Sequence, residues 1–195
     1  KELLRKAMWD GERHRTSSTV AIAPQQLAKI AGFEIPADRK FIMVHGDGIG
    51  KEHHFSGEKL TTLLALYKYQ SFDQALEMMR GVYEVGGKGH SCGIYSFDPD
   101  HVHRLAMAAP VSRIMVRQPQ SKANAGAFNN GMPMTSSLGC GTWGGNIISE
   151  NVHLKHYLNT TWVSVPIKED KPADDELFGS FYDPALEAEV ETITT

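Results

Sequence analysis

The chain has few cysteines, no long apolar run and no excess of basic residues. Its 195 residues include only Cys92 and Cys140, too few for a disulfide framework and without the paired spacing of a zinc site. No apolar stretch approaches the roughly 18 residues that span a bilayer, and the N-terminal sequence KELLRKAMWDGERHR lacks the apolar core of a signal peptide. A net charge of −3, without a basic run, is not the footprint of a nucleic-acid-binding protein. We expect a cytoplasmic protein without metal, nucleic-acid or membrane partners.

Hydrophobic residues make up 41% of the chain, enough for a core in one domain, or in a domain with a tail. Helical spacing or capping signals predict helices over residues 1–12, 24–31, 71–87 and 99–109, with a helical turn over 152–157. Apolar runs predict strands over residues 20–23, 41–44, 60–69, 91–96, 112–116 and 159–166. This alternation indicates an α/β fold with a parallel sheet and flanking helices, in which ligands bind beyond the carboxyl ends of the strands.

The sequence LGCGTWGGNIISEN, residues 138–151, is strongly biased in composition. Its glycines allow positive φ angles and a close approach to another surface, and Trp143 offers one rigid amphipathic face. Such a composition suits a loop beside a bound ligand, but also an ordinary turn between two strands. Its first half, residues 138–145, belongs to a polar run over residues 118–145 that is longer than most purely structural loops.

Several segments together resemble the CoA-acylating branch of the aldehyde dehydrogenase superfamily. They are GEKL at 57–60 with ALY at 65–67, GGKGHS at 86–91, the glycine-rich segment at 138–151, SENV at 149–152, and KH to Asn159. They occur in the family's order from about Ala28 to Val163. Within this branch, RQPQ at 117–120, NGMPM at 130–134 and LNTTWVS at 158–164 most resemble acylating sulfoacetaldehyde dehydrogenases, followed by acylating succinate-semialdehyde dehydrogenases.

The resemblance implies an oxidoreductase that converts a small-molecule aldehyde to its acyl-CoA, with NAD or NADP as coenzyme, CoA as co-substrate and no metal. Residues 1–165 would be the C-terminal part of the catalytic domain, with the strand near Trp162 and Val163 at the interface of a homo-oligomer, and residues 166–195 a polar acidic tail. The family's coenzyme-binding domain and nucleophilic cysteine precede the matched region. We therefore expect a fragment that is inactive alone.

The same resemblance assigns roles to individual residues. Glu58 and Leu60 would bind the coenzyme, Glu58 by accepting hydrogen bonds from the nicotinamide ribose, and His90 would be catalytic as a general acid or base in thioester formation. Gly141, Thr142, Trp143 and Gly144 would line the substrate site. Thr62 replaces the family's proline and Gly57 its histidine, so the local backbone path is expected to differ.

The residues alone leave other interpretations open. Glu58 could be a solvated glutamate, and His90 could be structural. Cys140 lies in a glycine cradle that would suit a nucleophile, although the resemblance makes it a site-lining residue. Cys92 reads as a buried strand residue.

Other patterns carry weaker signals. The pairs His53-His54 and His101-Val102-His103 do not indicate a metal site, because histidines two apart on a helix diverge. The sequence HGDGIG at 45–50 resembles a dinucleotide fingerprint but leads into no convincing helix. Arg113, Arg117 and Lys122 could form an anion site or lie solvated on the surface. Another aldehyde, such as succinate semialdehyde or acetaldehyde, and a non-catalytic oligomerisation module of the same fold remain alternatives.

Overall fold

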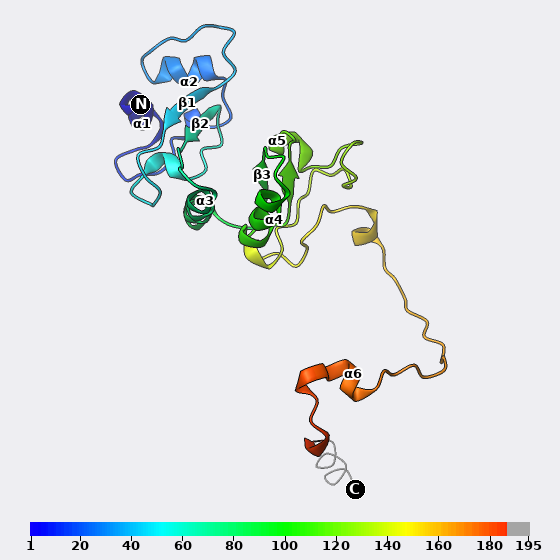
Figure 1. Ribbon diagram of the computed structural model, residues 1–195. Helices are drawn as coiled ribbons and strands as arrows, with labels where there is room; N and C mark the ends of the chain where they lie inside the picture. Colours follow the sequence, from blue (N-terminus) through cyan, green and yellow to red (C-terminus); the bar gives the residue numbers. More distant parts are fainter. Residues whose placement is uncertain (187–195) are drawn as a thin grey trace. The chain divides into compact units, whose positions relative to one another are not determined.

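The structure, a computed structural model, describes residues 1–186 (Figure 1). By its internal contacts the chain divides into two units, Lys1–Leu158 and Asn159–Thr195. All strands of the described part lie in the first unit. The second unit contains the short helix α6 (Asp174–Phe178). The division expected at residues 165 and 166 stays a prediction.

The N-terminal half of the first unit packs two helices onto a pair of strands. Helix α1 (Glu2–Met8) buries Leu4 and Met8, which lie one helical turn apart. Helix α2 (Pro24–Ile30) begins with a proline, whose fixed φ suits the first turn. Strands β1 (Ile42–His45) and β2 (Leu63–Leu66) pair in parallel. The hydrophobic core between these elements consists of Leu4, Met8, Trp9, Leu27, Ala31, Val44, Phe55 and Leu63.

The following half repeats the pattern with its own core. Helix α3 (Phe72–Gly86) starts where the Ser71 hydroxyl accepts the backbone N–H of Gln74, the expected cap. Helix α4 (Pro99–Ala108) is capped in the same way by Asp98. Strands β3 (Cys92–Ile94) and β4 (Ile114–Val116) pair in parallel, and α3 contacts α4. Their buried core consists of Leu76, Leu105, Ala109 and Val111.

Three sequence expectations are wrong within the described residues. The strands form two separate two-stranded sheets rather than one. Residues 20–23 form no strand, because Ala21 takes a positive φ of 54° and Pro24 has no N–H to continue a ladder. Residues 159–166 also form no strand, since no other described segment pairs with them and an unpaired strand is not stable alone.

The rest of the first unit is mostly irregular chain with short turns. Helix α5 (Gln120–Ala123) interrupts the long polar run. The predicted helical turn is present as a 3₁₀ turn, Leu154–Tyr157. Within the part of the chain that is described, no helix has both the length and the apolar character to span a membrane.

Candidate functional site

His90 lies in the loop that joins the end of α3 to β3. Gly87 and Gly89 take positive φ angles of 95° and 101° in this loop, where a side chain would be strained. The Gly89 N–H donates to the Pro110 carbonyl at 2.8 Å, and its own carbonyl accepts the Ser112 N–H at 3.0 Å. The loop is thus fixed beside the segment that precedes β4. The His90 side chain remains exposed, with its Nδ1 2.8 Å from the buried Ser91 hydroxyl.

The glycine-rich segment forms an irregular hairpin. Leu138 and Asn151 pair antiparallel at its base, and Gly141 donates its N–H to the Ile148 carbonyl at 3.0 Å. The side-chain oxygen of Asn146 accepts the Cys140 N–H at 2.9 Å. At the tip, Thr142–Gly144 form one 3₁₀ turn whose side chains are exposed. The expected turn is therefore present, and it presents Thr142 and Trp143 to solvent.

The hairpin packs directly against the His90 loop. A Cβ atom added to Gly89 would lie 2.5 Å from the Cys140 carbonyl oxygen and 2.8 Å from the Gly144 nitrogen. A Cβ added to Gly144 would lie 2.5 Å from the Cys140 Cβ and 3.3 Å from the Lys88 carbonyl oxygen. Real Cβ atoms do not approach so closely, so both positions require glycine. The predicted catalytic histidine and the predicted substrate-binding residues are thereby brought together.

The buried Arg113 side chain connects these two loops through hydrogen bonds. Arg113 is only 6% exposed. It donates to the His90 carbonyl at 2.9 Å, to the Asn151 side-chain oxygen at 2.8 Å, and to the Gly139 carbonyl. Asn151 extends the connection by donating to the carbonyls of Asn124 and Pro133. Burial lowers the pKa of the Arg113 guanidinium, and the neighbouring Cys140 acts in the opposite direction.

The proposed anion site is therefore not assembled around Arg113, which is directed at neutral acceptors. Arg117 is exposed, donates to the Ser96 carbonyl at 2.8 Å, and lies over the Phe97 ring. Lys122 is exposed on α5. The described residues contain no group of three or more His, Cys, Asp or Glu side chains that could hold a metal ion.

Glu58 lies on a loop that is rigidly held although its own side chain is exposed. The neighbouring Lys59 donates to the carbonyls of Phe55 and Gly57 at 2.9 and 2.7 Å, and burial lowers the pKa of its amine. Arg15 donates to the Lys59 carbonyl at 2.9 Å. Among the described residues, the Glu58 carboxylate has no hydrogen-bond or ion-pair partner. It is therefore free to accept hydrogen bonds from a ligand.

Leu60 follows on the same loop with a positive φ of 46° and a side chain that is 61% exposed. Its carbonyl accepts the Ala21 N–H at 2.8 Å. The backbone nitrogen of Glu58 is 3.7 Å from the position that a Cβ on Gly86 would take. Since Gly86 ends α3 and the His90 loop follows, the Glu58 and His90 loops both lie at the C-terminal end of this helix.

The two cysteines differ in their surroundings. Cys92 is partly buried in β3, and burial raises the pKa of its thiol, which disfavours the reactive thiolate. Cys140 belongs to the glycine-rich hairpin and packs against Gly89 of the His90 loop and Gly144 of its own loop. These positions fit the expected roles of a buried strand residue and a site-lining residue.

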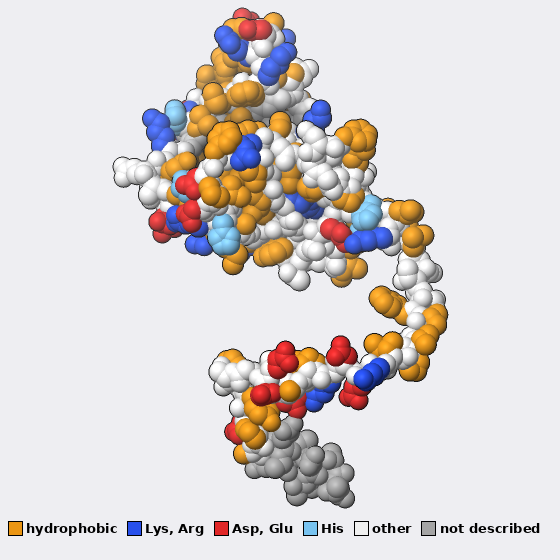
Figure 2. All heavy atoms as spheres, turned by 45° about the vertical axis from the view of Figure 1, so that its right-hand side comes forward, with side chains coloured by type: hydrophobic (Ala, Val, Ile, Leu, Met, Phe, Trp, Pro, Cys, Tyr) orange, Lys and Arg blue, Asp and Glu red, His pale blue; other side chains and the backbone are white. Residues whose placement is uncertain are grey.

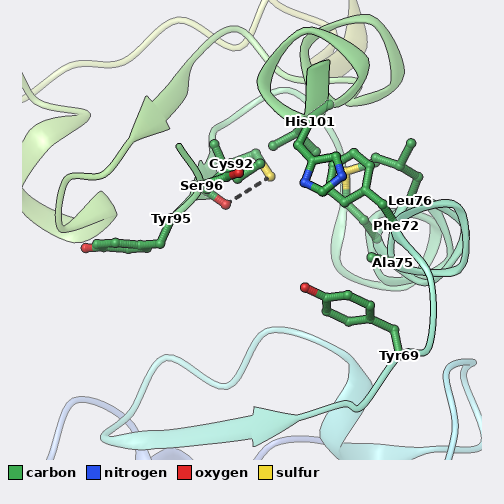
Figure 3. Close-up of a pocket in the computed structure, with 12 residues that line it drawn as sticks. Tyr69, Phe72, Ala75, Leu76, Cys92, Tyr95, Ser96 and His101 are labelled. Carbon is green, nitrogen blue, oxygen red and sulfur yellow. Dashed lines mark hydrogen bonds between the residues drawn. The ribbon is translucent and has the colours of Figure 1, made fainter. Parts of the chain in front are cut away.

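A separate cavity lies between α3, α4 and β3 (Figure 3). Its volume is about 440 Å³, and Figure 3 shows the stacked rings of Phe72 and His101 at one side and Tyr69 at another. None of the residues predicted for the functional site lines it. The sequence HGDGIG begins at the last residue of β1 and contributes to a different pocket of about 510 Å³ with Tyr67 and Met78. The element that follows it is the short 3₁₀ turn His54–Ser56 and not the α-helix that a dinucleotide fingerprint requires.

Sequence reasoning missed the residues that hold the site in place. They are Arg15 and Lys59, which fix the Glu58 loop by hydrogen bonds, and Tyr83, Gln120, Asn124 and Asn151 around the His90 loop. Gln120 and Asn151 belong to segments that carry the family resemblance, RQPQ and SENV, which was the available signal. Their contacts depend on sequence separations of 29 and 38 residues, which no local pattern reveals.

Solved structures define the class of fold. An acetylating aldehyde dehydrogenase from Geobacillus thermoglucosidasius superposes with a TM-score of 0.80 at 32% identity, covering 89% of this chain and 38% of that one. A probable aldehyde dehydrogenase from Listeria monocytogenes EGD-e superposes with a TM-score of 0.78 at 28% identity, covering 86% of this chain and 37% of that one. The predicted α/β aldehyde dehydrogenase fold is confirmed.

Curated relatives indicate which branch of aldehyde dehydrogenases the chain resembles. The chain is 37% identical over 185 residues to a sulfoacetaldehyde dehydrogenase of Acholeplasma sp, covering 93% of this chain and 38% of that protein. It is 37% identical over 184 residues to an acylating sulfoacetaldehyde dehydrogenase of Cupriavidus necator, covering 93% of this chain and 37% of that protein. An acetylating succinate-semialdehyde dehydrogenase of Clostridium kluyveri is 35% identical over 164 residues, which cover 84% of this chain and 36% of that protein. No protein-family model matches the chain.

These relatives confirm the predicted kinship with the CoA-acylating aldehyde dehydrogenases. The chain spans about 38% of the length of the first of them, so the similarity concerns only a part of that protein.

Proposed function

We propose that this chain supplies the coenzyme-ribose and thioester side of the active site in an NAD(P)-dependent, CoA-acylating aldehyde dehydrogenase. The observation that carries the proposal is the packing of the His90 loop against the glycine-rich hairpin, with both loops bonded to one buried arginine. Such an arrangement packs the loop of the exposed His90 against the loop of the exposed Trp143 on a shared hydrogen-bonded support, which suits a site for a reacting group. The relatives' names support the reaction class.

Each site residue has a distinct role in this proposal. Glu58 accepts hydrogen bonds from the nicotinamide ribose, for which its exposed and unpaired carboxylate on a fixed loop is suited. Leu60 contacts the coenzyme from the same loop. His90 assists at the thioester, and Gly141, Thr142, Trp143 and Gly144 line the substrate site. Bound NAD or NADP would accept the hydride, and CoA would accept the acyl group.

The aldehyde that we propose is sulfoacetaldehyde, because two acylating sulfoacetaldehyde dehydrogenases are among the relatives, at 37% and 35% identity. Succinate semialdehyde is the second candidate, supported by a relative at 35% identity. Since Cys92 is partly buried and Cys140 serves as a lining residue, the nucleophile comes from outside this chain in our proposal. A cytoplasmic location remains a prediction.

We also propose that the whole protein assembles as a homo-oligomer through the segment after Leu158. Trp162 and Val163 are 93% and 84% exposed, and Figure 2 shows hydrophobic side chains along this extended segment. An unpaired extended segment with exposed apolar side chains is suited to add a strand to a partner's sheet. The non-catalytic alternative would keep this assembly without any turnover.

The test is coenzyme reduction by the protein that contains this chain, with sulfoacetaldehyde and with CoA present or omitted. We expect turnover only with CoA, and none from the isolated 195-residue chain. Turnover without CoA would identify a hydrolytic dehydrogenase, and reduction by the isolated chain would contradict the assignment of the nucleophile.

A further inference from the structure

We propose that Ser91 is a positioning residue that donates its hydroxyl proton to Nδ1 of His90, fixing the neutral imidazole as the tautomer with its proton on Nε2. The role of His90 in turnover rests on the function proposed above, but the tautomer does not. The inference follows from the hydrogen bonds around the buried Ser91, which is 6% exposed.

The Ser91 carbonyl determines how the Gln120 amide is oriented. This carbonyl receives a hydrogen bond from the Tyr83 hydroxyl at 2.8 Å and another from Gln120 Nε2 at 2.9 Å. A carbonyl oxygen can only accept, so the Gln120 atom beside it must be the amide nitrogen. The ambiguity that usually attends a glutamine side chain is removed here by its partner.

The orientation of Gln120 then determines the role of the Ser91 hydroxyl. The same Gln120 nitrogen lies 2.9 Å from Ser91 Oγ and gives it a second hydrogen bond. The side-chain nitrogen of Asn124 lies 3.4 Å from Oγ and donates as well. A serine oxygen has two acceptor positions and one proton. With both acceptor positions occupied, Ser91 can only donate to a further neighbour.

That neighbour is Nδ1 of His90, 2.8 Å from Ser91 Oγ. An imidazole nitrogen that accepts a hydrogen bond carries no proton, so the proton of the neutral ring lies on Nε2. The exposed His90 ring therefore presents an N–H group rather than a lone pair at Nε2. In the proposed reaction it acts as a hydrogen-bond donor toward an oxygen or sulfur atom that gains negative charge.

The test is ¹⁵N NMR of the imidazole rings in the 195-residue chain at about pH 9, where an ordinary histidine is neutral. The His90 signals are assigned by their loss in His90→Gln. We expect the Nε2 shift of a protonated nitrogen and the Nδ1 shift of an unprotonated one. Ser91→Ala should move both shifts toward the averaged values of an exchanging ring, and Ser91→Thr should restore them.

A protonated Nδ1 in the unmodified chain, or unchanged shifts in Ser91→Ala, would overturn the proposal. Should Ser91→Ala fail to fold, Gln120→Leu tests the same claim. Removing the Gln120 amide frees an acceptor position on Ser91 Oγ, so the Nδ1-protonated form of His90 should increase. Unchanged ¹⁵N shifts of the His90 ring would again contradict the inference. Because the measurement involves no turnover, its failure would leave the proposed function untouched, and a failed activity assay would leave the tautomer untouched.

Discussion

Single residues in this chain divide into those that face solvent at the site and those that hold the site in place. Glu58, His90 and Trp143 are exposed, whereas Arg113, Ser91 and Asn151, which support the His90 loop and the hairpin, are buried. The buried group is polar and hydrogen-bonded throughout, so the loss of one member leaves its partners without a bond in a dry environment. Exposed residues should therefore affect kinetics, and buried ones should affect stability.

Arg113→Lys should lower the free energy of unfolding by about 2–4 kcal/mol, because one ammonium cannot replace a planar guanidinium that reaches three separate acceptors. Chemical denaturation of the chain measures this. Arg117→Lys is the matched control, since Arg117 is exposed and makes one backbone hydrogen bond. Equal losses in the two variants would show that Arg113 does not hold the loops together.

Glu58→Gln should raise the KM for the coenzyme in the whole protein by roughly 10-fold, because an amide accepts hydrogen bonds from ribose hydroxyls less strongly than a carboxylate. The change in kcat should be small. Steady-state kinetics with varied coenzyme measures both constants. Glu77→Gln, an exposed glutamate on α3, should leave them as they are, and a normal KM in Glu58→Gln would remove Glu58 from the coenzyme site.

At the scale of elements, the site depends on two loops without regular structure that pack through glycines. Gly89 and Gly87 lie in the same loop with similar positive φ angles, 101° and 95°. Only Gly89 is packed, since a Cβ on Gly87 would meet no atom within 4 Å. The pair separates the effect of backbone strain from the effect of loop packing.

Gly89→Ala should lower the unfolding free energy by about 2–4 kcal/mol, from backbone strain of about 1 kcal/mol or more together with the clash against Cys140. Gly87→Ala should show the strain alone. Thermal unfolding of the two variants compares them directly. A Gly89→Ala variant no less stable than Gly87→Ala would contradict the contact between the two loops.

Local signals were sufficient to predict most of the regular elements. The caps at Ser71 and Asp98, and Pro24 at the start of α2, define helix starts within a few residues, and these helices are present. The strands predicted at 20–23 and 159–166 are absent. Ala21 takes a positive φ in the first, and the second lacks, among the described residues, the paired neighbour that a strand needs. Apolar composition cannot say whether such a neighbour exists in the described chain.

The candidate site could be predicted only in part for a related reason. Resemblance pointed to Glu58, His90 and the glycine-rich segment, and the fold brings the last two together. The positively charged Arg113 suggested an anion site, but a sequence does not reveal that its side chain would be buried. The residues that support the site through hydrogen bonds, such as Gln120, come from distant segments of the sequence. Their contacts exist only in the folded chain.

At the scale of the whole molecule, our proposal makes this chain one part of a larger enzyme. It spans about 38% of the length of the Acholeplasma sulfoacetaldehyde dehydrogenase to which it is similar. The segment after Leu158 exposes Trp162 and Val163, which are expected to be covered in the assembled protein. In our proposal, contacts outside this chain complete both the active site and the oligomer.

The double variant Trp162→Ser, Val163→Ser should reduce the oligomer of the whole protein to smaller species, because it removes the apolar side chains proposed to lie at the interface. Light scattering coupled to size-exclusion chromatography measures the mass. Phe128→Ser is the control, since Phe128 is 97% exposed on a loop far from this segment in sequence. An unchanged mass in the double variant would place the interface elsewhere.

The central claim is that His90 assists acyl transfer to CoA, and CoA-dependent coenzyme reduction by His90→Ala tests it most directly. In the whole protein with sulfoacetaldehyde, we expect kcat/KM to fall by roughly 10²–10³-fold, the usual contribution of one hydrogen-bond donor that stabilises developing negative charge. His103→Ala, which removes an exposed histidine of α4, should keep full activity. A folded His90→Ala enzyme with normal CoA-dependent turnover would contradict the claim.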